Sequence, residues 1–215
     1  MQKRNYQREM DSLLERLKNE DKVPTLLLHS CCAPCSSYVL EYLSEYFSIV
    51  VFYYNPNISS EEEYNLRLSE QRRLIDAMKF KNSVSLIGDE YSPQEFYEIA
   101  KGFENCTERG QRCLRCYRLR LEKTAAMAAE IQADYFATTL TLSPLKNAQA
   151  INEIGEVLAM EYGVKYLASD FKKREGYKRS LELSREYSLY RQNFCGCIFS
   201  QRNKNESVTD ENDRF

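Results

Sequence analysis

Eight cysteines account for most of the chemistry that this 215-residue chain can offer. They form three groups along the sequence: Cys31, Cys32 and Cys35; Cys106, Cys113 and Cys116; and Cys195 with Cys197. His29 is the one histidine, so a site built mainly from histidine ligands is excluded by count. Residues 1–22 lack the apolar segment of a signal peptide, and we therefore expect a cytoplasmic protein. In that reducing compartment, cysteines serve as metal ligands or redox groups rather than as a disulfide scaffold.

The first two groups have the spacing of metal ligands. A CxxC pair such as Cys113 and Cys116 lets two thiolates reach one metal from a single turn, and two thiolate pairs from separate segments suit zinc or iron–sulfur. Cys31 and Cys32 are adjacent, and adjacent thiolates reach the separated irons of a cluster more readily than a single zinc ion. The pattern favours an iron–sulfur cluster, with a zinc site that only stabilises the fold as the alternative.

The third group, Cys195-Gly196-Cys197, indicates redox chemistry. Two cysteines with one residue between them can close a strained disulfide, and the glycine supplies the backbone freedom for closure. Strained disulfides are easily reduced, so they tend to be catalytic or regulatory. This pair therefore predicts a two-electron store beside a one-electron carrier.

Basic residues gather around the later cysteines, although the net charge is only −2. Acidic residues are in excess over residues 1–100, and basic residues are in excess over residues 101–191. The stretches 109–120 and 172–179 are the most basic, and Tyr177 and Phe194 lie in or near them. Such clusters can hold phosphates while aromatic rings stack on unpaired bases. The alternative is an ordinary solvated surface.

Apolar runs alternate with amphipathic segments, which predicts an α/β fold. We expect a doubly wound, mostly parallel five-stranded sheet of the Rossmann-like or nucleotide-hydrolase-like kind, with helices on both faces. The expected strands cover 25–29, 49–54, 83–87, 134–140 and 164–168. The expected helices cover 6–20, 36–47, 60–80, 92–102, 113–131, 147–160 and 177–188.

These elements predict a single catalytic domain over residues 1–200. It would contain an N-terminal helix within residues 1–22 and a cysteine-rich insert at 103–120. The polar residues 201–215 lack periodicity and are expected to form a disordered tail. In such sheets, sites form beyond the carboxyl ends of the strands, where Cys31 and Cys32 follow the first strand. The glycine-rich loop that would bind ATP phosphates is missing there.

Five segments together resemble the QueH-type epoxyqueuosine reductases over residues 25–200. They are HSCCAPCSSYVLEYL, RCLRCYRLRL, FATTLTLSPLKN, SDFKKREGYKRSLELSREYSLYRQ and FCGCIFS. The resemblance implies an oxidoreductase that acts without cobalamin, reducing epoxyqueuosine to queuosine in the anticodon loop of tRNA. That reaction needs two electrons and two protons, an external electron donor and no membrane. His29, Tyr117 or a lysine are candidates to supply protons.

The resemblance also implies a 4Fe-4S cluster. Its ligands would be Cys31, Cys32, Cys113 and Cys116, and the redox-active pair would be Cys195 and Cys197. An additional mononuclear iron is also expected, with Asp170 as a carboxylate ligand, whereas Cys35 and Cys106 receive no role. Two other functions remain open at this point: an enzyme resembling the ATP-dependent tRNA thiolation enzymes, and a zinc-stapled RNA-binding module without catalysis.

Overall fold

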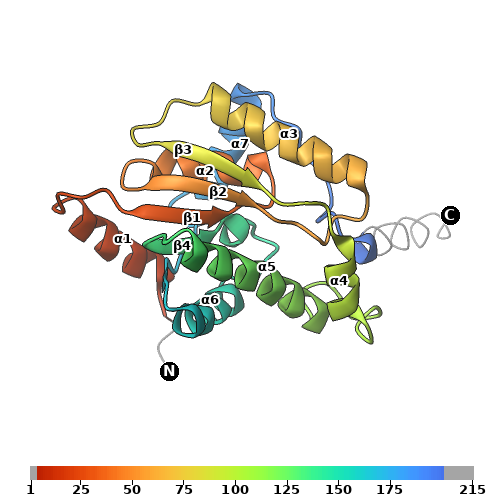
Figure 1. Cartoon of the computed structure of the whole chain (residues 1–215). Helices are drawn as coiled ribbons and strands as arrows, with labels where there is room; N and C mark the ends of the chain where they lie inside the picture. Colours follow the sequence, from red (N-terminus) through yellow and green to blue (C-terminus); the bar gives the residue numbers. More distant parts are fainter. Residues whose placement is uncertain (1–3, 201–215) are drawn as a thin grey trace.

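A computed structural model describes residues 4–200 and places five parallel strands in one sheet, in the order β3-β2-β1-β4-β5 (Figure 1). The strands are β1 Thr25–His29, β2 Ser48–Tyr53, β3 Val84–Gly88, β4 Tyr135–Thr138 and β5 Lys165–Tyr166. The chain runs outward from β1 through β2 to β3, then returns to the other side of β1. This reversal confirms the expected doubly wound sheet. The predicted tail at 201–215 lies outside the described residues.

Helices cover both faces of the sheet (Figure 1). On one face lie α1 Tyr6–Leu17, α2 Ala33–Leu43, α3 Glu61–Ala77 and α7 Gly176–Glu186. On the other lie α5 Gln111–Glu130 and α6 Ala148–Tyr162. The short helices are α4 Pro93–Ala100 and the 3₁₀ helix η1 Thr139–Leu142. Within residues 4–200, no helix combines the length and apolar character that a membrane crossing requires.

The central strand β1 is apolar on both of its faces. Leu26 and Leu28 pack toward α1 and α2, whereas Leu27 packs toward α5 and α6. All three leucines are fully buried, as expected for a parallel strand between two helical layers. Backbone pairing to β2 on one side and β4 on the other fixes the point where β1 ends. The residues that follow therefore start from a rigid position.

Several element boundaries differ from the sequence-based expectation, and three of these differences concern the candidate site. The strand expected over 134–140 ends at Thr138, because the Thr138 side chain accepts a hydrogen bond from the Leu140 N–H (3.1 Å) and starts η1. The helix expected from residue 36 begins at Ala33, since Pro34 is well tolerated in a first helical turn. The helix expected from residue 113 begins at Gln111, so Cys113 lies within the first turn of α5 rather than at its start.

Candidate functional site

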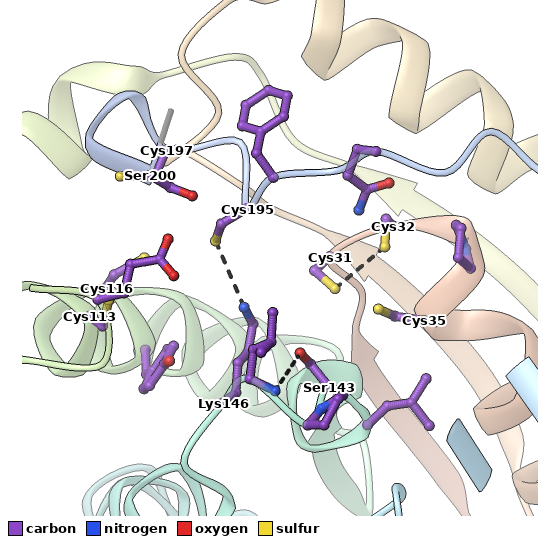
Figure 2. Close-up of a pocket in the computed structure, with 18 of the residues that line it drawn as sticks. Cys31, Cys32, Cys35, Cys113, Cys116, Ser143, Lys146, Cys195, Cys197 and Ser200 are labelled. Atoms are coloured by element: carbon purple, nitrogen blue, oxygen red, sulfur yellow. Dashed lines mark hydrogen bonds between the residues drawn. The ribbon is translucent and has the colours of Figure 1, made fainter. Parts of the chain in front are cut away.

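A cavity of about 300 Å³ lies beyond the carboxyl ends of β1 and β4 (Figure 2). Three segments that are distant in sequence contribute cysteines to its wall: the β1–α2 turn, the start of α5, and the loop before residue 200. The cysteines that line it are Cys31, Cys32, Cys35, Cys113, Cys116, Cys195 and Cys197. Cys106 is not among the lining residues. All six cysteines given a role in the sequence analysis thus face one space.

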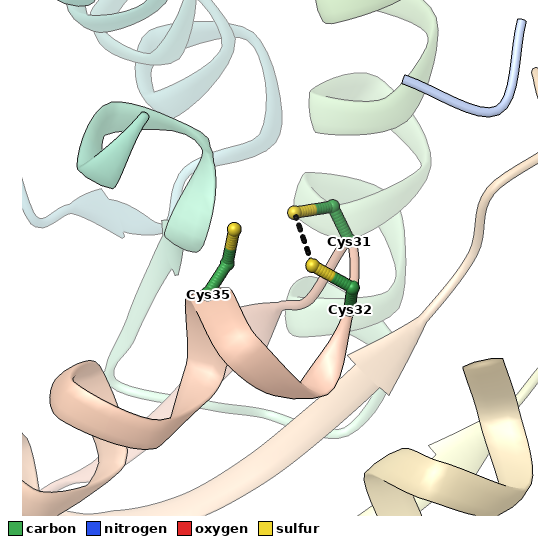
Figure 3. Close-up of side chains that lie close together, drawn as sticks. All are labelled: Cys31, Cys32 and Cys35. Carbon is green, nitrogen blue, oxygen red and sulfur yellow. Dashed lines mark hydrogen bonds between the residues drawn. The ribbon is translucent and has the colours of Figure 1, made fainter. Parts of the chain in front are cut away.

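Cys31, Cys32 and Cys35 form a compact thiol trio at the end of β1 (Figure 3). Their Sγ atoms all lie within 4.8 Å of one another, and those of Cys31 and Cys32 are 3.7 Å apart. Cys32 is the N-cap of α2 and Cys35 lies in its first turn, so the positive end of the helix dipole faces the sulfurs. Three sulfurs this close can hold one metal ion, or can serve as separate ligands of a cluster.

Sequence reasoning gave Cys35 no role, yet the signal was present. Cys32 and Cys35 have CxxC spacing, which the adjacent Cys31–Cys32 pair obscured. The helical first turn that brings the Cys35 sulfur back toward Cys32 was expected three residues later.

The trio stabilises one negative charge. The pKa of Cys31 is held well below its ordinary value, because the thiols of Cys32 and Cys35 donate hydrogen bonds to its sulfur and Lys146 adds a positive charge. The same hydrogen bond to Cys31 raises the pKa of Cys32 to about 12. The pKa of Cys35 is raised for the same reason, with burial adding to it. A metal would let the remaining thiols ionise, since a coordinating thiol loses its proton.

The second wall of the cavity is the start of α5, which carries Cys113 and Cys116. The backbone N–H of Arg109 donates to the Cys113 Sγ (3.3 Å). The buried Arg112 guanidinium donates to the carbonyl oxygens of Phe103, Glu104 and Cys106 at 2.7–3.0 Å, tying the preceding loop to the helix. Cys116 is buried, and burial raises its pKa. The CxxC pair is thus presented by an ordered helix start.

The third wall is the loop that carries Cys195 and Cys197, both of which are free thiols. The Ser59 N–H donates to the Gly196 carbonyl (3.0 Å), and Asn57 Nδ2 donates to the Cys195 carbonyl (3.2 Å). Gly196 has a φ of 94°, and a Cβ at this position would lie 3.0 Å from Ile58 Cγ1. Glycine is therefore required both by the backbone conformation and by the close approach.

Two cations face these sulfurs without a carboxylate partner among residues 4–200. The Nζ of Lys146 lies 3.8 Å from the Cys195 Sγ (Figure 2). Arg120 is 2% exposed and donates only to the side-chain oxygen of Asn55 (3.3 Å) and the carbonyl of Cys116 (3.4 Å). Burial raises the pKa of Cys195, but the charges of Lys146 and Arg120 outweigh it and leave that pKa below its ordinary value. A buried guanidinium beside a half-buried ammonium favours a negative group nearby, which thiolates or an anionic cluster would supply.

Comparison with known proteins identifies the family. The family model described as "Epoxyqueuosine reductase QueH" matches residues 26–203. The chain belongs to the QueH family. A relative of that name from Streptococcus pyogenes serotype M1 is 42% identical over 94% of this chain and 80% of its own length. Those from Staphylococcus epidermidis and Thermotoga maritima are 43% and 36% identical, covering 93% and 85% of this chain and 85% and 93% of their own lengths.

The resemblance predicted from the motifs is therefore confirmed, and this QueH family member is an oxidoreductase of the epoxyqueuosine reductase kind. None of the comparisons assigns a role to a particular residue of the chain. The ligand set and the redox pair stay predictions, supported by the geometry described above.

Asp170, predicted as an iron ligand, is not among the residues that line the cavity of this QueH family member. Its carboxylate forms an ion pair with Lys172. Two neighbouring basic residues are also paired within the protein: Arg174 with Asp11 and Arg179 with Glu41, both at 2.6 Å. These ion pairs reduce the free charge that the 172–179 stretch offers for phosphate. Arg109 and Arg191, by contrast, line the cavity.

His29 is fully buried under the trio and has a structural role. Its Nε2 donates to the Tyr54 carbonyl (3.1 Å), and its Nδ1 accepts from the Thr138 hydroxyl (2.8 Å). Burial, aided by the charge of Arg120, lowers its pKa to about 3. A ring with both nitrogens bonded and no place in the cavity wall is a poor proton donor to a substrate, so Tyr117 and Lys146 remain as candidates from the lining.

Proposed function

We propose that this QueH family member reduces epoxyqueuosine to queuosine in the anticodon loop of tRNA. The proposal rests on the convergence, on one cavity, of seven thiols and two cations that have no carboxylate partner among residues 4–200. Bases in such loops can be extruded and read by a protein pocket. The cavity has the volume of a small ligand site, and the rings of Tyr177 and Phe194 in its lining suit stacking on one base.

We assign Cys31, Cys32, Cys113 and Cys116 as the ligands of a 4Fe-4S cluster. The donor chemistry supports this assignment, because the four thiols come from two walls of the cavity and include the low-pKa Cys31. When bound, such a cluster supplies one-electron transfer. The chain's own contribution is to hold the thiols, exclude water and balance the negative charge with Lys146 and Arg120.

Cys195 and Cys197 form the proposed two-electron store. Opening an epoxide to an alkene consumes two electrons and two protons and releases water. Oxidation of the two thiols to a disulfide supplies two electrons. An external electron donor must then reduce the disulfide before the next turnover, and cobalamin is not required by this scheme.

The additional iron implied by the resemblance is better served by Cys35 than by Asp170. Once the four proposed ligands are assigned, Cys35 is the thiol that remains beside Cys31 and Cys32. Asp170 faces Lys172 outside the cavity. We therefore assign Cys35, rather than Asp170, to the second iron.

The decisive experiment replaces Cys113 by Ala, with Cys106→Ala as the matched control. Both residues lie in the same region, but only Cys113 lines the cavity. Anaerobically purified C113A should lose its iron–sulfur absorbance and its reductase turnover, measured by nucleoside analysis of tRNA, whereas C106A keeps both. Retention of both properties by C113A would refute the ligand assignment. Stoichiometric zinc without iron would favour the RNA-binding module, and ATP-dependent sulfur insertion would favour the thiolation enzyme.

A further inference from the structure

Lys146 is a lysine whose ammonium group lies inside the cavity. It follows η1 and points toward the Cys195 loop from the opposite wall (Figure 2). Among residues 4–200, its ammonium group has one hydrogen-bonding partner, the Cys195 sulfur at 3.8 Å, and no carboxylate pairs with it. A half-buried ammonium that faces a thiol is most stable when that thiol is ionised.

Other charged groups lie near Cys195, but each is engaged elsewhere. Arg67 on α3 forms an ion pair with Glu63 (2.6 Å) and reaches only the Cys195 carbonyl. Arg120 on α5 bonds the Asn55 side chain and a backbone carbonyl. Cys31 in the β1–α2 turn and Tyr117 on α5 contribute negative charge only when ionised. Within the described part of the chain, Lys146 is thus the one cationic side chain that hydrogen-bonds the Cys195 sulfur.

The two thiols of the pair have different surroundings. Both line the cavity, but Cys195 faces Lys146, whereas Cys197 is buried in an apolar cluster with Phe96 and Phe199. Burial raises the pKa of Cys197 to about 12, so it keeps its proton. One cysteine of the pair is therefore suited to be a thiolate and the other to be a thiol.

We propose that Lys146 and Cys195 form an ammonium–thiolate pair in which Lys146 holds one of the two protons consumed by the reduction. The Cys197 thiol holds the other. This proposal rests on the proposed function and names the proton donor of that site.

The atoms and charges balance without any further group. The reactants are the Cys195 thiolate, the Cys197 thiol, the Lys146 ammonium and the epoxide. The S–S bond forms, both C–O bonds of the epoxide break, and the oxygen leaves as water with one proton from Cys197 and one from Lys146. The products are the disulfide, a neutral lysine and the alkene, so the total charge is zero on both sides. A dithiol reductant then restores the two thiols, and solvent returns the lysine's proton.

The test compares Lys146→Met with Lys146→Arg in anaerobically reconstituted protein. The rate of Cys195 alkylation by iodoacetamide is measured against pH, and the alkylated residue is located by mass spectrometry. K146M should shift the alkylation midpoint upward by about one pH unit or more, since the thiolate loses its ammonium. K146R should keep the wild-type midpoint, because the charge remains. Lys101→Met, which removes an exposed lysine paired with Glu98, should leave the midpoint and turnover unchanged.

Measurements of turnover distinguish the positive charge of residue 146 from its ability to give up a proton. A guanidinium keeps its proton, so K146R should lose reductase turnover by about 10²-fold despite a normal alkylation profile. K146M should lose both the low alkylation midpoint and the reductase turnover, while its iron–sulfur absorbance stays intact. An unchanged midpoint in K146M would overturn the ion pair, and normal turnover in K146R would overturn the proton transfer. Neither result depends on whether Cys195→Ser abolishes turnover, which tests the proposed function separately.

Discussion

The first wall of the cavity, which carries the trio of Cys31, Cys32 and Cys35, and the third wall, which is the Cys195 loop, hold their thiols by different means. The trio at the end of β1 is positioned by a buried central strand and the first turn of α2. The Cys195 loop follows no strand, and it is fixed by side-chain and backbone hydrogen bonds to residues 57–67 and by one left-handed glycine. The first wall therefore derives its geometry from the fold, while the third depends on a few specific contacts.

This difference corresponds to a difference in chemistry. Metal ligands need fixed sulfur positions, which a sheet edge and a helix start provide. A redox pair must form and break a disulfide, which requires some local freedom. The comparison predicts that substitutions in the first wall change metal content, and that substitutions in the third wall change turnover.

Cys195→Ser should give the largest difference between an effect on turnover and an effect on metal content. It removes the sulfur that faces Lys146 but none of the proposed cluster ligands. Turnover should fall to background while the iron–sulfur absorbance of the anaerobic protein is kept. If the variant reduced its substrate at the normal rate, the third wall would have no redox role.

Gly196→Ala sharpens the comparison by disturbing the third wall without removing a thiol. The new Cβ would lie 3.0 Å from Ile58 and 3.2 Å from the Arg67 guanidinium, at a φ of 94°. We expect a cost of about 1–2 kcal/mol to the loop and a turnover about tenfold lower, measured by tRNA nucleoside analysis. Gly102→Ala is the matched control: its φ is also positive, at 77°, but it has no neighbour within 4 Å. Equal turnover in the two variants would contradict the role given to the loop.

Cys35→Ala tests the first wall. Its thiol should be needed for the second iron but not for the cluster, so we expect lower total iron with the cluster absorbance retained. Elemental analysis against the sulfide content measures this directly. Complete loss of the absorbance would instead place Cys35 among the cluster ligands.

The smallest expected effect concerns the stability of the first wall at low pH. His29 is neutral and buried, with a pKa of about 3 in the folded protein against about 6.5 in the unfolded chain. Between these values the unfolded chain binds the extra proton, so the free energy of unfolding falls as pH falls from 6.5 toward 3. The slope is about 1.4 kcal/mol per pH unit from this group alone. The free energies of unfolding of wild type and His29→Gln, measured by denaturant titration at several pH values, should differ in their pH dependence by that slope. If the two plots of free energy against pH were parallel, His29 would not contribute it.

The fold was predictable because apolar periodicity and strand spacing are local signals. The doubly wound sheet and the position of Cys31 and Cys32 at the end of its first strand followed from the rule for parallel sheets. The pairing of Asp170 with Lys172 was not predictable, since it depends on side-chain geometry rather than on spacing. The sequence indicated only that some lysine could supply protons and did not single out Lys146, because its lack of a carboxylate partner among residues 4–200 is a property of the folded cavity.

The N-cap of α2 has a wider consequence. In sheets of this kind the first helix after β1 often receives a phosphate group. Here Cys32 occupies the cap without a capping side-chain hydrogen bond, and sulfur stands where an oxyanion would otherwise bind. The residues of one short turn thus determine whether such a fold is suited to binding nucleotide phosphates or to electron transfer, and the rest of the fold need not change.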